Sequence, residues 1–274
     1  MSQGTRVLLL FDNVNRHYVS RVTEGAIGAA KGTQFKIEAV NLFGREDELA
    51  PDLFTEGYQG VILTPPLSDD RRVLTILEQQ RTPFVRIASM LDLDRGASVL
   101  MDELAASKMI AKLLIDAGHE KIAFIRGPRE HLVNIRRYNG YAGALGGARL
   151  APDPALVFKG DFSRASGRQA AEVLFKLHPT AIFASNDEMA LGVMDYAKEV
   201  GVAIPDDVSV VGFDDDEEAS RYVPSLTTVK QPLREMGASA VQLISEAKVG
   251  SNLNGRIVEV DFEVCSRDSV RTLG

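Results

Sequence analysis

The stretch TAIFASNDEMALGVMDYAKEVGVAIPDDVSVVGFDDD, residues 180–216, contains two apolar runs separated by a helical pattern. The runs Thr180–Ala184 and Val208–Val211 are short and mainly apolar, which is typical of strands buried in a parallel sheet. Between them, Glu188–Val200 has helical periodicity and ends at Gly201, a residue type that commonly follows a helix. Strand, helix and strand in this order predict a β-α-β unit.

The same alternation continues along most of the chain. Further strands are predicted at residues 6–11, 36–40, 60–63, 84–88, 121–126, 156–158, 227–229 and 256–264. Further helices are predicted at residues 19–30, 73–80, 102–116, 136–145, 164–177 and 233–247. Repeated β-α-β units imply an α/β protein whose parallel sheets are covered by helices on both faces. So many units indicate two sheets, and the pattern restarts near Gly118, where we expect the first boundary.

The composition is that of a soluble globular protein, with 45% hydrophobic and 25% charged residues among 274. The net charge of −7 argues against this chain alone gripping a nucleic-acid backbone, because that affinity depends on Lys and Arg. Cys265 is the single cysteine, so no internal disulfide is possible. The apolar run Val7–Phe11 is too short for a secretory leader, and no apolar stretch is long enough to span a membrane. These features predict a cytoplasmic protein without a membrane partner.

Polar clusters follow three of the predicted strands. They are Asp12-Asn13, Asn186-Asp187 and the acidic run Asp214–Glu218. In open parallel sheets, ligands bind beyond the carboxyl ends of the strands. The clusters are therefore candidate ligand-binding residues.

The motifs of several enzyme classes are absent from the sequence. It has no G-x-G-x-x-G, no G-x-x-x-x-G-K-[ST] and no G-x-S-x-G, and its four histidines form no H-E-x-x-H. The acidic run lacks the spacing of a calcium-binding loop. A metal ion on this run, or a glycosidase-type acid pair, remains the weaker alternative. We expect no enzyme activity, no cofactor and no metal.

Several longer motifs occur in one order along nearly the whole chain. They are LLFDNVNRHYVSRVTEGA, GYQGVILTPP, DAGHEKIAFIRGP, the R-x-x-G-Y of Arg137–Tyr141, KGDFSRASGRQAA and Pro179–Pro232. Together they resemble the effector-binding core of transcription regulators of the lactose-repressor/galactose-repressor (LacI/GalR) family. The resemblance implies two parallel-sheet subdomains of the periplasmic-binding-protein type, joined by three crossovers, with the ligand in the cleft between them. It places the first subdomain at 4–117 plus 233–261 and the second at 118–232 plus 262–274.

Family members usually begin with a helix-turn-helix domain of roughly 60 residues. The residues before Arg6 are too few for one, so we expect the effector-binding core without its DNA-binding domain. The resemblance implies a homodimer that binds a small effector, expected to be a sugar. It would act on operator DNA only through the missing domain.

The resemblance also suggests site residues in the second subdomain. Arg137 would bridge ligand hydroxyls, Asp214 would accept from two of them, and Phe162 would stack on a sugar face. Asn186 would contact the ligand or cap the following helix, although Asp187 fits that cap better. Gln231 would reach the site from a crossover. The remaining acids of the run, residues 215–218, are expected to be solvated or to cap a helix.

Further candidate residues have open alternatives. Asp12, Asn13 and Tyr18 resemble family residues of the first subdomain, although Tyr18 fits core packing equally well. Arg86 ends a predicted strand, where a buried charge needs a partner. Asp102 lines the site or only caps its helix, and His131 lies in a loop that contacts effector in some relatives.

The sequence leaves the effector unnamed, with sugars and a purine all open. A transport protein of similar fold is the alternative function. It predicts a secretory leader, which this sequence does not show. An enzyme on the same fold would need a nucleophile or metal set, which the motifs do not supply.

Overall fold

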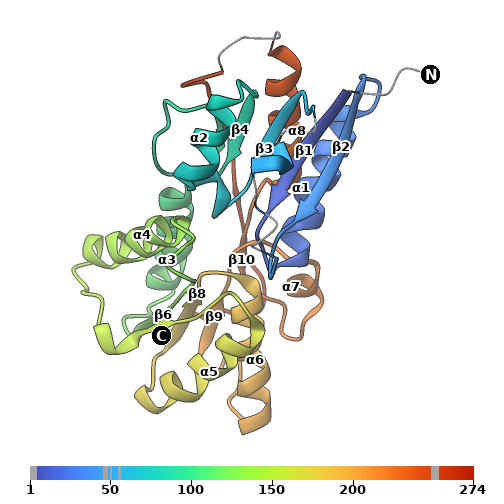
Figure 1. Cartoon of the computed structure of the whole chain (residues 1–274). Coiled ribbons are helices and arrows are strands. Elements are labelled where there is room, and N and C mark those ends of the chain that lie inside the picture. The colour runs from blue at the N-terminus through green and yellow to red at the C-terminus, as the bar shows by residue number, and fades with distance from the viewer. Residues whose placement is uncertain (1–4, 46–48, 50, 55–56, 248–252) are drawn as a thin grey trace. The chain divides into compact units, whose positions relative to one another are not determined.

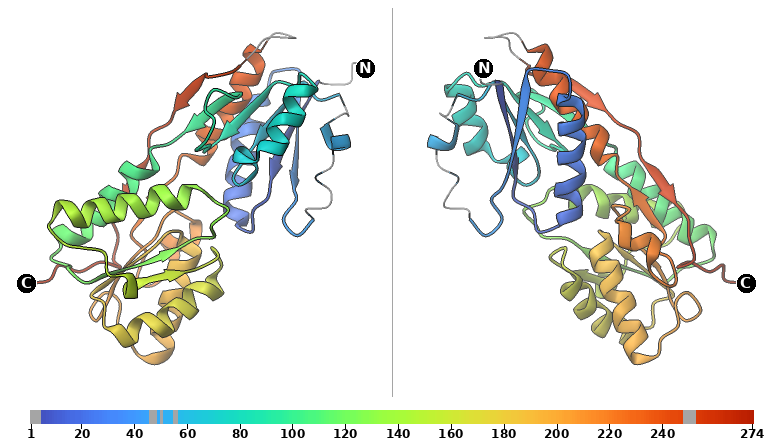
Figure 2. Two further views of the ribbon diagram at one scale, coloured as in Figure 1. Left: turned by 60° about the vertical axis from the view of Figure 1, so that its left-hand side comes forward. Right: turned by 90° about the vertical axis from the view of Figure 1, so that its right-hand side faces the viewer.

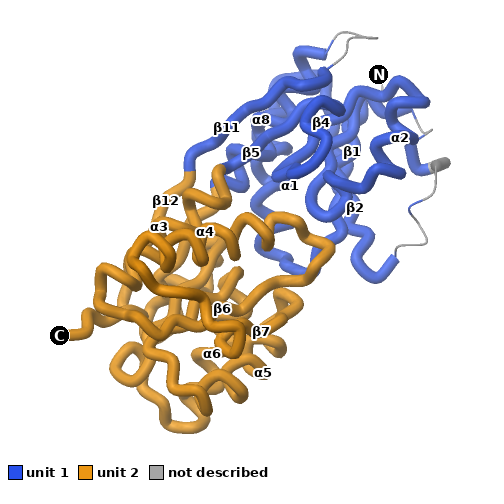
Figure 3. Tube along the Cα trace, turned by 90° about the vertical axis from the view of Figure 1, so that its left-hand side faces the viewer, with its two compact units in different colours: residues 1–101, 232–261 blue, residues 102–231, 262–274 orange. Residues whose placement is uncertain are grey.

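The computed structural model describes residues 5–45, 49, 51–54, 57–247 and 253–274. The chain forms two compact units, which Figure 3 shows in separate colours. Unit 1 contains residues 1–101 and 232–261, and unit 2 contains residues 102–231 and 262–274. The chain therefore passes between the units three times, as expected from the resemblance.

Unit 1 is built on a six-stranded parallel sheet in the order β11-β5-β4-β3-β1-β2. Its strands are β1 (Thr5–Phe11), β2 (Phe35–Asn41), β3 (Gly60–Leu63), β4 (Phe84–Ile87), β5 (Ala97–Leu100) and β11 (Ile257–Glu259). The central strands β1, β3 and β4 are almost wholly buried. The continuous apolar sequences Val7–Phe11 of β1 and Gly60–Leu63 of β3 are the pattern that two covered faces require.

Helices cover both faces of the unit 1 sheet. Helices α1 (Arg16–Ala30) and α8 (Leu233–Glu246) pack against each other on one face (Figure 2). Helix α2 (Arg71–Gln79) covers the other face, over an apolar cluster that includes Val61. The neighbouring Gly60 faces α8, because a Cβ there would lie 2.6 Å from Ile244. Adjacent strand residues thus point to opposite helical layers.

Unit 2 contains a four-stranded parallel sheet in the order β7-β6-β8-β9. Figure 1 labels three of its strands, β6, β8 and β9. The strands are β6 (Ile122–Arg126), β7 (Val157–Lys159), β8 (Ala181–Ala184) and β9 (Ser209–Val211). A separate antiparallel pair is formed by β10 (Thr228–Lys230) and β12 (Glu263–Cys265). Single bridges from Val211 to Thr227 and from Asp214 to Lys230 connect β9 to this pair.

Two pairs of helices cover the unit 2 sheet. Helix α3 (Glu103–Asp116) packs along α4 (Val133–Gly147), and α5 (Arg164–Leu174) packs along α6 (Asp187–Val200). Gly167 permits the second contact, because a Cβ there would lie 2.0 Å from the Met189 carbonyl oxygen. The short helix α7 (Glu217–Arg221) follows β9. The single-turn helices are η2 (Pro51–Phe54), η3 (Leu67–Asp69), η4 (Pro154–Leu156) and η5 (Phe175–Leu177).

The α/β fold with two parallel sheets confirms the predicted class. Three details differ from the sequence-based prediction. The predicted strand 256–264 is two strands, β11 in unit 1 and β12 in unit 2, because the chain changes units between them. Strand β5 and helix α7 were not predicted. The first passage lies at 101/102 rather than 117/118, because α3 packs on α4.

Candidate ligand-binding site

The candidate residues of unit 2 follow the carboxyl ends of its strands. Asn186 lies two residues after β8, Asp214 three residues after β9, and Gln231 one residue after β10. Phe162 lies three residues after β7. Because the strands of the sheet are parallel, their carboxyl ends share one edge. We call the end of the sheet where Phe162, Asn186, Asp214 and Gln231 follow their strands the unit 2 edge.

Arg137 reaches the unit 2 edge from the first half of α4. Its Nη1 donates to the Ser185 carbonyl oxygen at 2.6 Å and lies 3.8 Å from Asp214 Oδ1. The guanidinium also stacks over the Phe213 ring, with its carbon 3.8 Å from the ring centroid. The side chain is 5% exposed, so its charge needs compensation within the protein.

Glu103 supplies that compensation. Its Oε2 accepts from Arg137 Nε at 2.7 Å, and its Oε1 accepts from Nη2 at 3.2 Å. This two-pronged geometry is the strongest form of Arg–carboxylate pair. Glu103 was not among the predicted residues, because an acid in the first turn of a helix is common on electrostatic grounds alone.

Asp214 is 6% exposed and adopts a left-handed backbone with φ of 127°. Gln231 Nε2 donates to its Oδ1, and its own amide nitrogen donates to the Val229 carbonyl oxygen at 2.8 Å. Burial raises the pKa of Asp214 to about 8, against the lowering effect of Arg137; Asp187 and Glu103 raise it further. At neutral pH this carboxyl can therefore donate a hydrogen bond as well as accept one.

Asp187 lies beneath Asp214 in the same buried acidic region. Its Oδ1 accepts from the Thr228 hydroxyl at 2.6 Å, and its Oδ2 accepts from the Asp216 amide at 2.8 Å. Burial raises the pKa of Asp187 to about 6, although the two hydrogen bonds act in the opposite direction. Asp187 thereby connects the start of α6 to β10 and to the acidic run.

The expected division of roles between Asn186 and Asp187 is wrong. Asn186 is the N-cap of α6, because its Oδ1 accepts from the Met189 amide at 3.0 Å. Its Nδ2 donates to the Phe162 carbonyl oxygen at 3.0 Å. Asp187, which the sequence suggested as the cap, is instead wholly buried in the contacts to Thr228 and Asp216. A ligand role of Asn186 stays a prediction alongside these structural contacts.

Phe162 and His131 meet edge to face, with ring centroids 5.2 Å apart. Phe162 adopts a left-handed backbone with φ of 69°, which the bond from Asn186 helps to fix. Burial, followed by the nearby Arg137 charge, lowers the pKa of His131 to about 4. The imidazole is therefore neutral near pH 7 and adds no positive charge to the unit 2 edge.

Residues 215–218 were expected to be solvated or to cap a helix, and Asp215 does neither, because it pairs with Arg267. Asp216 lies at the N-cap position of α7 but is 5% exposed and makes no side-chain capping bond. Glu218 is exposed and pairs with Arg164 at 2.7 Å. The acidic run is therefore partly internal, because α7 begins within it and turns the chain back toward the sheet.

Asp102 caps α3, accepting from the Ala105 amide at 2.9 Å, and it is exposed. The structure thus gives it the capping role of the two that the sequence left open. A ligand contact for Asp102 stays a prediction.

In unit 1, Asp12 and Asn13 follow β1 directly and are half-buried. Asn13 Oδ1 accepts from the Asn15 amide at 2.8 Å, and Asn41 bonds both polar groups of the Asn13 backbone. Tyr18 is 8% exposed and its ring meets Phe11 edge to face at 6.4 Å, which fits the packing alternative. Ligand roles for these three residues stay predictions.

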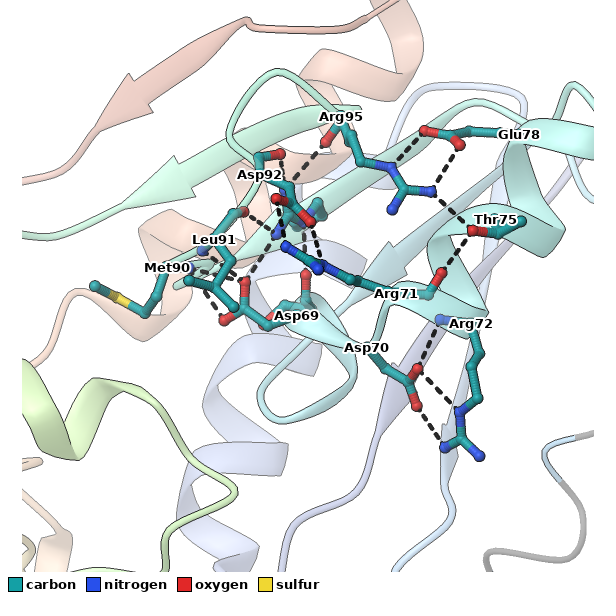
Figure 4. A network of polar contacts seen from close by, with 12 residues as sticks. Asp69, Asp70, Arg71, Arg72, Thr75, Glu78, Met90, Leu91, Asp92 and Arg95 are labelled. Atoms are coloured by element: carbon teal, nitrogen blue, oxygen red, sulfur yellow. Dashed lines mark hydrogen bonds and ion pairs between the residues drawn. The ribbon is translucent and has the colours of Figure 1, made fainter.

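Arg86 has a structural role rather than the suggested ligand role. It is 0% exposed, and all five of its donor positions are bonded within unit 1. The acceptors are Asp69 Oδ1 and the carbonyl oxygens of Ser68, Leu91, Asp92 and Arg95. Asp69 also accepts from the Met90 and Leu91 amides, as Figure 4 shows. This network folds the loop 88–95 around the guanidinium.

Two ion pairs connect the same loop to α2. Arg71 donates to both carboxylate oxygens of Asp92, at 2.8 and 3.1 Å, and Arg95 donates to both of Glu78, at 2.8 and 2.7 Å (Figure 4). The position of Arg86 at the end of a strand suggested a ligand contact. It is explained by a buried charge whose partners lie within unit 1.

Among the described residues, no group of three or more His, Cys, Asp or Glu side chains is arranged to hold a metal ion. Nor does any described helix have the length and apolarity that crossing a membrane requires.

Comparisons with known proteins give consistent results. Residues 111–270 match the family of the periplasmic binding protein-like domain. The chain is 36% identical to the transcriptional repressor PurR of Vibrio atlanticus (strain LGP32) over 167 residues, covering 60% of this chain and 50% of PurR. It is 33% identical to catabolite control protein A of Priestia megaterium over 198 residues, covering 71% of this chain and 60% of that protein. The chain thus spans half to three fifths of the length of these curated relatives.

A structural match extends over almost the whole chain. The solved complex of the transcriptional regulator CelR with cellobiose superposes with a TM-score of 0.87 at 27% identity, covering 96% of this chain and 84% of that one. The fold, the family match and the named relatives agree. The chain belongs to the periplasmic-binding-protein-like family and, within it, to the effector-binding cores of LacI-type transcriptional regulators.

Proposed function

We propose that this chain senses a small effector, expected to be a sugar, that binds at the unit 2 edge. One observation carries the proposal. Residues from separate segments gather at that edge through direct contacts, although they are far apart in the sequence. The contacts join Arg137 to Asp214, Asp214 to Gln231, Asn186 to Phe162, and Phe162 to His131.

The chemistry of this set suits a polyhydroxylated ligand. Asp214 and Gln231 offer acceptors and donors, and the half-buried Phe162 ring offers an apolar face. The similarity to a regulator solved with cellobiose supports a carbohydrate. A purine, which the sequence also leaves open, is the second ligand class.

The proposed mechanism is a ligand-dependent shift between arrangements of the two units. A ligand that contacts both units changes their equilibrium only by its differential affinity for the two arrangements, typically about 1–3 kcal/mol. In a full-length regulator, this shift would alter operator binding by a separate DNA-binding domain. We also propose a homodimer, a cytoplasmic location and no enzymatic activity, which the repressor relatives favour. Because those relatives are regulators, we do not propose the transport alternative.

A thermal-shift screen of sugars and nucleosides tests the proposed function. A ligand that binds only the folded protein raises the melting temperature by mass action. The site variant is Asp214→Asn, which keeps the side-chain shape, and the control is Asp206→Asn at an exposed position of unit 2. We expect a hit on the wild type to be retained by Asp206→Asn and reduced in Asp214→Asn. An unchanged hit in Asp214→Asn would place the ligand elsewhere.

A further inference from the structure

We propose that Glu103 is a specificity-determining residue that restricts the ligand of the unit 2 edge to uncharged or positively charged molecules. The inference rests on the proposed function and names a property of its ligand.

Acids outnumber bases among the buried charged residues that the structure describes in unit 2. Glu103, Asp187, Asp214 and Asp216 are each at most 6% exposed, whereas Arg137 is the only Arg or Lys buried to this extent among the described residues of the unit. Arg267 is about one-fifth exposed and is paired with Asp215. A guanidinium is the group that usually recognises phosphate and carboxylate ligands, because its fork matches their geometry.

Glu103 already occupies that fork. Its two oxygens accept from Nε and Nη2 of Arg137, and Nη1 donates to the Ser185 carbonyl oxygen. An anionic ligand could not take the Nε and Nη2 donors for a two-pronged contact without displacing a buried carboxylate. It would also add a negative charge near Asp187, whose carboxyl has a pKa of about 6 and is therefore mainly ionised at pH 7. Like charges brought together in a buried site disfavour binding strongly.

The other groups around Asp214 do not reverse this balance. His131 is neutral near pH 7, because burial lowers the pKa of its imidazole to about 4. Gln231 donates to Asp214 as a neutral amide. Burial keeps Asp214 itself protonated at neutral pH, with its pKa raised to about 8. A ligand hydroxyl or amine can therefore form a hydrogen bond with the protonated carboxyl of Asp214. A positively charged ligand ammonium group can instead pair with the Asp214 carboxylate after the carboxyl has released its proton to solvent.

The hydroxyl of Ser185 is a second, independent indication that the unit 2 edge accepts a ligand hydroxyl or amine. Its side chain is 0% exposed, and its Oγ bonds to no group among the described residues. Side chains alternate along β8, so Ser185 shares a sheet face with Phe183. Phe183 packs on Phe124, which packs on Tyr141 of α4, the helix that carries Arg137. A buried hydroxyl without a partner is a position where a ligand hydroxyl or amine gains a hydrogen bond.

The test removes the competing charge and measures anion binding with inorganic phosphate as the probe. Glu103→Gln keeps the side-chain shape but releases the guanidinium charge, and Glu103→Gln/Asp214→Asn prevents Asp214 from replacing Glu103 as the counter-ion. Glu172→Gln, at an exposed position of α5, is the matched control. Phosphate binding is measured at pH 7 by broadening of its ³¹P resonance, and far-ultraviolet circular dichroism checks folding.

We expect no phosphate binding by the wild type or by Glu172→Gln. In the double variant, we expect an affinity for phosphate at least about tenfold higher than in the wild type, because a buried like charge has been removed. Phosphate binding by the wild type, or its absence from a folded double variant, overturns the proposal. If the double variant does not fold, the single Glu103→Gln variant is measured at pH 5, where Asp214 is protonated and does not act as the counter-ion, and the same two outcomes decide.

A second experiment measures stabilisation by matched sugars, amino sugars and sugar phosphates. It distinguishes a failure of this inference from a failure of the proposed function. The wild type is screened with glucose, glucosamine and glucose 6-phosphate, and with the corresponding galactose series. Stabilisation by a parent sugar or its amine, but not by its phosphate, supports both proposals. Stabilisation by the phosphate overturns the charge selectivity while leaving a sugar-sensing function in place. If no member stabilises the protein, the expectation of these sugars fails, and the phosphate titration decides the inference alone.

Discussion

Glu103 and Arg137 form a two-pronged ion pair in which both side chains are at most 5% exposed. Glu103 begins α3 and Arg137 lies in α4, so the pair joins two helices that cover the same sheet face. It therefore fixes the position of the guanidinium at the unit 2 edge and neutralises the charge that the edge would otherwise present.

We expect removal of either partner to destabilise unit 2. Glu103→Ala and Arg137→Ala should each lower the free energy of unfolding by about 3–5 kcal/mol, because each leaves an uncompensated buried charge. The double variant should lose less than the sum of the two, by about 1–3 kcal/mol. Urea unfolding followed by circular dichroism measures all three values.

The exposed pair Lys112–Asp116 of α3 is the control for this cycle. Its side chains are 65% and 61% exposed, so Asp116→Ala should change the free energy of unfolding by only about 0.5 kcal/mol. If Glu103→Ala costs no more than Asp116→Ala, the buried pair does not contribute as described.

Asp214 should make the stability depend on pH in a defined direction. Its carboxyl has an ordinary pKa of 3.8 when unfolded, and burial raises the pKa in the folded protein to about 8. A raised folded-state pKa stabilises the protein fully below pH 3.8, and this contribution is lost as the pH rises toward 8. The wild type should therefore lose stability relative to Asp214→Asn by roughly 2–4 kcal/mol between pH 5 and pH 8.

Urea unfolding of both proteins at several pH values in this range gives the difference directly. A difference that stays constant, or that grows in favour of the wild type at higher pH, would show that Asp214 is ionised in the folded protein.

Arg86 should be essential for the stability of unit 1 and for the order of loop 88–95. Arg86→Met removes the donor to four carbonyl oxygens and leaves the Asp69 carboxylate without its counter-charge, so we expect a loss of about 3–5 kcal/mol. Arg72→Met, at a side chain that is 84% exposed, should leave the free energy of unfolding nearly unchanged. Urea unfolding measures the loss, and hydrogen exchange at Met90 and Leu91 reports the loop. Unchanged exchange in Arg86→Met would refute the structural role.

The alternation of apolar runs and helical patterns was sufficient to predict most of the fold. The exceptions have physical causes. Residues 256–264 look like one strand, yet β11 and β12 belong to different units, because the local pattern carries no information about which sheet a strand joins. Strand β5 was missed because Ala97 and Ser98 are small and weakly apolar, although tertiary packing buries them.

The candidate site was predictable only in part. Strand-end position and the family resemblance together identified Arg137, Asp214 and Gln231, which the structure brings into contact. Glu103 could not be predicted, because its partner lies 34 positions away and no local pattern encodes the pair. Arg86 shows the opposite error, since a buried arginine looks the same in sequence whether its partners are internal groups or a ligand.

The most direct test of the central claim is to locate a bound ligand by nuclear magnetic resonance. The strongest hit of the thermal-shift screen is titrated into ¹⁵N-labelled, deuterated protein, and the amide resonances are followed. We predict the largest shifts in unit 2 at the amides of Gly127, Phe162, Asn186, Asp214 and Gln231, which border the unit 2 edge. Saturable shifts that leave these five amides unchanged would contradict the account.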